Sequence, residues 1–258
     1  MASRSFALHC AEPENASVRV LLIPHAGAGT SSSAGLRRHV PTDWMVATAR
    51  LPGRESRIRE QVTGLDGLVD DVVRTVRALP GSAPLILVGV CSGAVIGLEA
   101  LRELQRHDPT LVAGLVVVAQ GALNEDPAPT ARLLRDTDST AEVIEIVQGL
   151  GGIPDTVAAN EEMLQMVLPG IVADFRAVEG HRAEPQPLLT CPLLTIAGHD
   201  DELCSEERME GWSLYAEQVF DRRIDGGHML LTDSPAALVE CITDHLPQLT
   251  SDTLERRR

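Results

Sequence analysis

The sequence contains no lysine, and all 22 of its basic residues are arginine. Acidic residues outnumber the basic ones, so the formal net charge is -15 at pH 7. A chain with this charge is repelled by nucleic acid and by anionic membranes, and we expect neither as a partner. The missing lysine also excludes the G-x-x-x-x-G-K-[ST] phosphate loop of nucleotide-binding proteins.

Aromatic residues make up only 2% of the chain, so the core must be built from aliphatic side chains. No apolar run is long enough to span a bilayer, and the first residues lack the apolar stretch of a signal peptide. The five cysteines are odd in number, scattered and without metal-ligand spacing. This pattern favours free thiols in a reducing compartment. The sequence therefore predicts a cytoplasmic protein without a bound metal.

Short apolar runs alternate with helical patterns along the 258 residues, which predicts one α/β domain over 1–258 with a mostly parallel central sheet flanked by helices. Each apolar run is nearly continuous, as expected for a strand buried on both faces. The expected strands are Val18–Pro24, Leu85–Gly89, Gly114–Ala119, Pro192–Ala197 and one near Gln218–Ile224, with helices at Leu65–Leu79, from Ser92 to about Arg106, and from Ser234–Pro235 onward.

The stretch 124–187 interrupts the alternation of strands and helices. It is rich in helix-forming residues, is broken by Pro and Gly, and lies between two expected strands. Connections this long inside a compact domain are usually functional, so we interpret it as a helical lid insertion. A set of ordinary crossover helices is the alternative.

The segment Gly89-Val90-Cys91-Ser92-Gly93 directly follows an expected strand and precedes a helix. This is the G-x-S-x-G nucleophile elbow with cysteine in the central place, and the flanking glycines are needed because the turn is too tight for side chains. The turn would present Cys91 at a helix N-terminus, which favours a thiolate and then an oxyanion. Two alternatives stay open: Cys91 is a buried structural cysteine, or Ser92 is the nucleophile.

His228 follows two glycines after the last expected strand, where the base of such an enzyme belongs. The acid should follow the preceding strand, which leads into Asp200 and Asp201. We choose Asp201, with Asp200 as the alternative; the acid would orient the imidazole and stabilise its protonated form.

A glycine-rich loop, Pro24–Gly29, follows the first long strand. Loops in this place supply one N–H of an oxyanion hole, here that of Ala26, and the residue after the nucleophile, Ser92, supplies the other.

Seven segments carry a family resemblance, and they occur in the family's order: LLIPHAGAG at Leu21–Gly29, LPGRESR at Leu51–Arg57, the elbow, VADFRAVEGH at Val172–His181, GHDDE at Gly198–Glu202, Trp212, and GGHM at Gly226–Met229. Over nearly its whole length the sequence resembles type II thioesterases of nonribosomal peptide and polyketide pathways. The resemblance implies a lidded α/β-hydrolase fold and a monomer. It also implies no cofactor of its own, with the substrate carried on the phosphopantetheine of an acyl or peptidyl carrier protein, and substrate contacts from His25 and Met229.

The chain departs from the family at three places. The family elbow usually reads G-H-S-M-G, Met229 replaces an aromatic residue, and Ser31–Ala34 replaces an aromatic-rich stretch. A cysteine nucleophile would form a thioester that stays activated toward a second thiol, an amine or a carbon nucleophile. The sequence therefore predicts either hydrolysis of the acyl group or its transfer or cyclisation.

Two rival classes are weaker. A non-catalytic binding module could keep the same residues, and a carboxylesterase or lipase is disfavoured by the LPGRE segment. The arginines near that segment predict either a docking patch for an acidic carrier protein or a solvated loop; they are Arg50, Arg54, Arg57 and Arg59.

Overall fold

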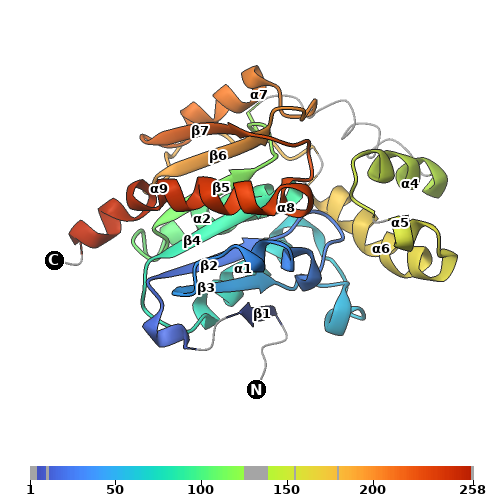
Figure 1. Cartoon of the computed structure of the whole chain (residues 1–258), viewed down its shortest axis with the longest axis horizontal. Coiled ribbons are helices and arrows are strands. Elements are labelled where there is room, and N and C mark those ends of the chain that lie inside the picture. The colour runs from blue at the N-terminus through green and yellow to red at the C-terminus, as the bar shows by residue number, and fades with distance from the viewer. Residues whose placement is uncertain (1–4, 10–11, 125–138, 154, 179, 257–258) are drawn as a thin grey trace.

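A twisted, mostly parallel sheet forms the centre of the computed structural model (Figure 1). The structure describes residues 5–9, 12–124, 139–153, 155–178 and 180–256. Within them the sheet has seven strands in the order β1-β3-β2-β4-β5-β6-β7. β1 pairs with β3 antiparallel and every other pair is parallel. The strands are β1 Phe6–His9, β2 Val18–Ile23, β3 Trp44–Ala49, β4 Leu85–Val90, β5 Gly114–Val118, β6 Leu193–Gly198 and β7 Val219–Ile224.

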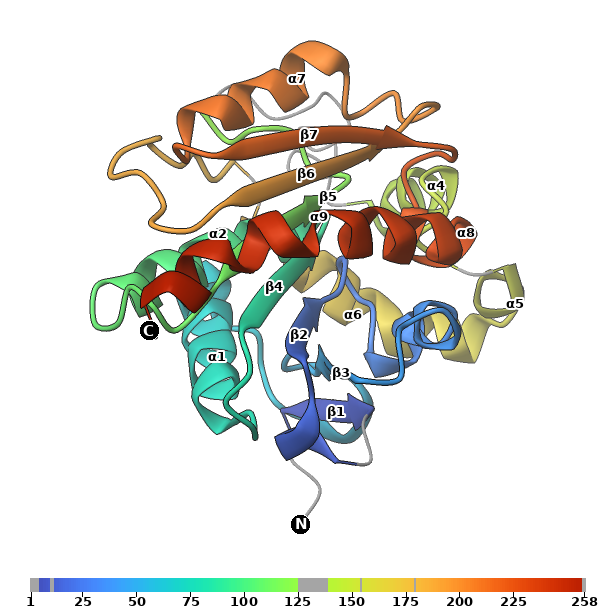
Figure 2. The ribbon, with the colours of Figure 1, turned by 60° about the vertical axis from the view of Figure 1, so that its left-hand side comes forward.

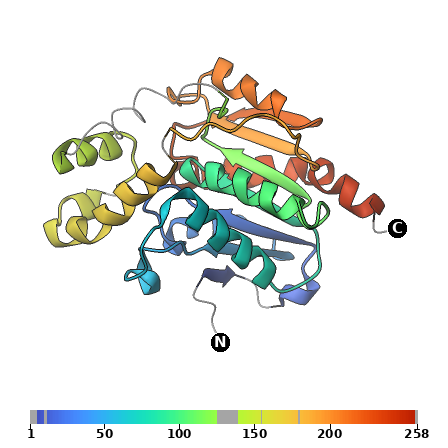
Figure 3. The same ribbon diagram turned by 180° about the vertical axis from the view of Figure 1, so that it is seen from behind.

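Helices cover both faces of the sheet. Figure 1 shows α9 lying along one face, and Figure 3 shows α1 and α2 along the other. Figure 2 shows the twist of the sheet from the different inclinations of β4 and β7. The helices are α1 Gly64–Ala78, α2 Ser92–Gln105, α4 Thr140–Gly149, α5 Asp155–Ala158, α6 Glu161–Val178, α7 Glu206–Glu210, α8 Leu230–Asp233 and α9 Pro235–Arg256. Short 3₁₀ helices lie at Pro13–Asn15, Thr30–Ser33, Leu36–Arg38, Glu55–Arg57 and Gly211–Leu214.

The alternation of side chains along each strand divides the aliphatic core in two. Leu21 and Ile23 of β2 belong to the cluster that contains the buried residues of α1 and α2. Val20 and Leu22 belong to the cluster that contains those of α9. Both faces of β2 are therefore buried, which explains why its sequence is a continuous apolar run.

The α/β-hydrolase architecture expected from the sequence is confirmed, and so are the five expected strands and the three expected helices, to within a few residues. Two strands were not foreseen. β3 contains the polar, fully buried Thr48, which breaks the apolar run. β1 is a partly exposed, four-residue strand at the edge of the sheet, where the apolar signal is weak.

Three helices, α4 to α6, occupy the described part of the 124–187 stretch, between β5 and β6. They have a small hydrophobic cluster of their own, which includes Val147, Leu168 and Ile171. Figure 1 shows them beyond one end of the sheet rather than over its faces. Residues 125–138, 154 and 179 of the stretch lie outside the described residues. Among the described helices, none is both long and apolar enough to cross a membrane.

Candidate active site

Cys91 lies at the sharp turn between β4 and α2, with φ 50° and ψ -120°. A positive φ is strained for any residue other than glycine, and it is a feature of nucleophile elbows. The flanking glycines are required: a Cβ on Gly89 would lie 2.4 Å from Cα of Ala94, and one on Gly93 would lie 2.2 Å from the carbonyl oxygen of Ile23. Ser92 is the buried first residue of α2, so the strained residue at the turn is Cys91.

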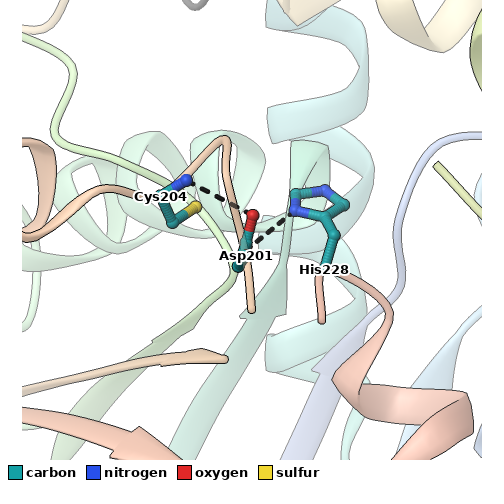
Figure 4. A group of neighbouring side chains, drawn as sticks. All are labelled: Asp201, Cys204 and His228. Carbon is teal, nitrogen blue, oxygen red and sulfur yellow. Dashed lines mark hydrogen bonds and ion pairs between the residues drawn. The ribbon is translucent and has the colours of Figure 1, made fainter. Parts of the chain in front are cut away.

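His228 and Asp201 form a hydrogen-bonded pair in the loops after β7 and β6 (Figure 4). The distance from Nδ1 of His228 to Oδ2 of Asp201 is 3.0 Å. The other carboxylate oxygen of Asp201 accepts the backbone N–H groups of Leu203 at 3.0 Å and of Cys204 at 3.3 Å. Asp200 is exposed. The structure therefore brings Asp201, and not Asp200, into contact with the histidine.

The protonation of His228 is set by its neighbours. Burial alone would lower the pKa of His228, but its electrostatic interaction with the nearby Cys91 and the hydrogen bond to Asp201 raise it well above its ordinary value. Burial would raise the pKa of Asp201, but the hydrogen bond and charge of His228 hold it below its ordinary value. Nε2 of His228 is buried and has no hydrogen-bond partner in the described part of the chain. The site thus favours an imidazolium whose free N–H can reach a reacting group.

Cys204 is a neighbour of the pair that the sequence did not single out (Figure 4). It is 1% exposed, and burial raises the pKa of its thiol to about 11. Its sulfur lies within 4.8 Å of ligand atoms of Asp201 and His228, the one such group of three among the described residues. With this raised pKa the thiol is neutral at pH 7, beside the hydrogen-bonded pair. Only its position three residues after the acid could have indicated it.

Ala26 and Ser92, the residues predicted to supply the N–H groups of the oxyanion hole, are both buried. Neither N–H donates a hydrogen bond within the described residues. Buried N–H groups without a partner are rare, and their occurrence here fits a site that binds an oxyanion. The Ala26 N–H belongs to a turn that is closed by the bond from Ala28 N to the carbonyl of His25, at 3.1 Å. Gly27, at φ 72°, supplies the positive φ in this turn.

A cavity of about 530 Å³ lies between this loop and helices α5 and α6. His25 and Met229, the two residues expected to contact substrate, both line it. Burial, with smaller contributions from the charges of His228 and Arg54, lowers the pKa of His25 to about 4, so this side chain is neutral at pH 7. Its Nδ1 is buried without a hydrogen-bond partner among the described residues. The rest of the wall is mostly small or aliphatic and includes Gly152, Val157 and Ile171.

Two of the four clustered arginines, Arg54 and Arg57, are buried and cannot form a docking patch. Arg54 and Arg57 are 5% and 8% exposed. Arg54 pairs with Asp174, and Arg57 with Asp71, at 2.7 and 2.6 Å. Both expectations, a basic docking surface and a solvated loop, are therefore wrong for these two residues, because internal carboxylates bury them. Arg50 also has an internal partner, Glu55, whereas Arg59 is exposed.

The family model described as "Thioesterase domain" matches residues 18–246, which include every residue of the site. The chain belongs to the thioesterase family. Its sequence is 27% identical to "Thioesterase PikA5" of Streptomyces venezuelae over 234 residues, covering 90% of this chain and 82% of that protein. It is 25% identical to "Gramicidin S biosynthesis protein GrsT" of Aneurinibacillus migulanus, covering 90% of each.

Solved structures place this thioesterase-family protein within the α/β-hydrolase superfamily. The type II thioesterase BorB from the borrelidin biosynthetic cluster superposes with a TM-score of 0.81 at 25% identity, covering 95% of this chain and 99% of that one. The type II thioesterase YbtT of the yersiniabactin pathway shares the fold, with a TM-score of 0.79 at 21% identity, covering 91% and 95%. The resemblance expected from the sequence motifs is confirmed, and the chain is a type II thioesterase by family.

Proposed function

We propose that this thioesterase accepts an acyl, aminoacyl or peptidyl group from the phosphopantetheine of a carrier protein onto Cys91. The group then passes to water or to a second nucleophile. The observation that supports this most strongly is the strained Cys91 at the elbow, beside a hydrogen-bonded His228–Asp201 pair. The relatives support the substrate class, because their names refer to thioesterases or to the biosynthesis of products such as gramicidin S.

The first half-reaction transfers the acyl group to the enzyme. The Cys91 thiolate attacks the thioester carbonyl carbon, and the N–H groups of Ala26 and Ser92 stabilise the resulting oxyanion. The tetrahedral intermediate collapses with cleavage of the bond to the pantetheine sulfur, and this leaving thiolate takes the proton from Nε2 of His228. Asp201 holds the imidazole in the orientation that this transfer requires.

The second half-reaction begins with neutral His228. The histidine removes a proton from water, or from an acceptor thiol or amine, as that nucleophile attacks the acyl-Cys91 thioester. Expulsion of the Cys91 thiolate restores the ion pair. Because the acyl-enzyme is itself a thioester, transfer to another thiol is nearly an even exchange, so the acceptor present decides between hydrolysis and transfer.

We further propose that α4 to α6 form a lid over the acyl site. The helices carry their own hydrophobic cluster, and residues from α5 and α6 form one wall of the cavity. The cavity volume is within the range of sites for small molecules.

Intact-protein mass spectrometry of the enzyme with an acylated carrier protein tests the proposal. An acyl adduct on Cys91 that clears when an amine or a second carrier thiol is added would indicate transfer. Rapid release of free acid without a lasting adduct would indicate hydrolysis. Cys91→Ala should abolish both, whereas the matched control Cys241→Ala, at a buried thiol in α9, should abolish neither. Absence of adduct and of deacylation across a broad acyl panel would instead favour a binding module.

A further inference from the structure

Helix α6 is attached directly to the loop that carries the Ala26 N–H. Asp174 of α6 is 1% exposed, and its Oδ2 accepts the backbone N–H of Gly27 at 2.8 Å. One turn earlier on the same helix, Ile171 packs so closely that a Cβ on Gly27 would lie 2.1 Å from its Cγ1. Two residues of one helix face therefore fix the residue that follows Ala26.

Arg54 completes this attachment from the other side. Its Nη2 donates to both carboxylate oxygens of Asp174 at 2.7 Å. Its Nη1 donates to the carbonyl oxygen of Ala28 at 3.0 Å. The buried Arg54–Asp174 pair thus binds two successive residues of the turn, the N–H of Gly27 and the carbonyl oxygen of Ala28. The planar guanidinium is suited to this, since it donates in two fixed directions at once.

The neighbouring residue of the LPGRE segment contacts the same loop. Glu55 accepts from the N–H of Thr30 at 2.7 Å and from its hydroxyl, and it pairs with Arg50. Glu55 has φ 48°, one of three positive values at described residues other than glycine. A strained backbone conformation of this kind is kept only where several surrounding contacts hold it in place. Segment Leu51–Arg57 therefore holds the glycine-rich loop and the residue after it in place from Gly27 to Thr30. This stretch, with Ala26 before it, is called the oxyanion loop below.

We propose that Asp174 and Arg54 are positioning residues, which set the orientation of the Ala26 N–H for the thioester carbonyl oxygen. This inference rests on the function proposed above. It implies that α6 stays attached to the loop that carries the Ala26 N–H. Any opening of the lid would then be a movement of α4 and α5.

The charge on Arg54 also contributes, because it compensates the buried carboxylate of Asp174. Burial raises the pKa of Asp174 despite the opposing effect of Arg54. An unpaired carboxylate here would take up a proton or oppose the negative charge that develops on the substrate oxygen. Removal of Arg54 alone should therefore harm acylation more than removal of the charge from Asp174, and removal of both charges together should recover part of the loss.

The test compares two reactions of Cys91. Acylation by a short-chain N-acetylcysteamine thioester needs the oxyanion hole, whereas alkylation by iodoacetamide forms no oxyanion and needs only the thiolate. We expect Asp174→Asn to slow acylation about 10- to 100-fold, less than the roughly 10²–10³-fold typical of deleting an oxyanion donor. Alkylation should change by less than about 2-fold, because the Cys91–His228 pair is untouched. The exposed Glu162→Gln on the same helix is the matched control and should leave both rates unchanged.

The rates separate the outcomes. Acylation by Asp174→Asn at the native rate would overturn the inference, and so would equal losses of acylation and alkylation, which indicate damage to the nucleophile or the fold. If the native protein is alkylated but accepts no thioester, the proposed function itself is wrong and the inference fails with it. Should Asp174→Asn not fold, as judged by thermal unfolding, Arg54→Lys provides the same comparison, since it keeps the charge and loses the two-directional hydrogen bonding.

Discussion

Nδ1 of His228 lies 3.0 Å from Oδ2 of Asp201, although 27 residues separate the two in the sequence. Asp201 follows β6 and His228 follows β7, and these strands are parallel neighbours. The loops after parallel strands meet at the same edge of the sheet, which explains how distant residues reach each other. The elbow after β4 opens at that edge too, so three strands supply the three side chains of the site.

Asp201→Asn should reduce kcat by about 10³- to 10⁴-fold with the fold intact. An amide cannot stabilise the imidazolium, and it favours the wrong tautomer of His228. Asp200→Asn is the matched control at the exposed neighbouring position and should retain activity within about 2-fold. Steady-state release of the carrier thiol measures both. Equal losses in the two variants would contradict the assignment of the acid.

Iodoacetamide at pH 7.5 should modify Cys91 far faster than Cys204 or Cys241. Burial raises the pKa of each of the latter two thiols to about 11, so their thiolate fraction at this pH is very small. Peptide mapping by mass spectrometry reports each site separately. Labelling of Cys204 as fast as Cys91 would show that Cys204 is exposed and reactive in solution.

His25 should make the protein less stable in mild acid. Its pKa is lowered to about 4 in the folded state from 6.5, so below pH 6.5 the unfolded chain binds a proton that the folded chain does not. Between pH 7 and pH 5 this linkage should cost about 2 kcal/mol of unfolding free energy. Urea unfolding at both pH values, compared with His25→Asn, isolates the effect. The variant should lose less stability on acidification, and an equal loss would refute the linkage.

The Arg57–Asp71 pair should contribute to stability, unlike ion pairs on the surface. Asp71 is 4% exposed and receives hydrogen bonds from both terminal nitrogens of Arg57. Asp71→Asn removes the buried counter-charge of Arg57 and leaves only the more exposed Glu60 as its partner, so we expect a loss of about 1–3 kcal/mol. Glu103→Gln breaks an exposed pair with Arg106 and should cost less than about 1 kcal/mol. Denaturant unfolding compares the two, and similar losses would show that burial does not decide the effect.

Much of the site could be predicted from local sequence. The glycines around Cys91 and the placement of Asp201 and His228 after successive strands follow from steric rules and from the topology of parallel sheets. Cys204 was not foreseen, because its position three residues after the acid is the only sign in the sequence, and its residue type does not distinguish it from a buried structural cysteine.

The role of Arg54 was also beyond local reasoning. Arginine is rarely buried unless it is paired, and the partner, Asp174, lies 120 residues further along the chain. Only the packing of α6 against the oxyanion loop brings these two residues together. The same applies to Arg57. It lies in a run of arginines that suggested a basic surface, but the fold buries its side chain.

The strained turn at position 91 bears on the exchange of cysteine for serine. The turn brings backbone so close to Gly89 and Gly93 that neither position has room for a Cβ, and these restrictions do not involve the side chain of residue 91. The turn can therefore accommodate either a serine oxygen or a cysteine sulfur at position 91. Serine and cysteine differ by a single side-chain atom, so Cys91→Ser should keep the same turn and the same fold, and any change that it causes in the reaction comes from the chemistry of that atom alone.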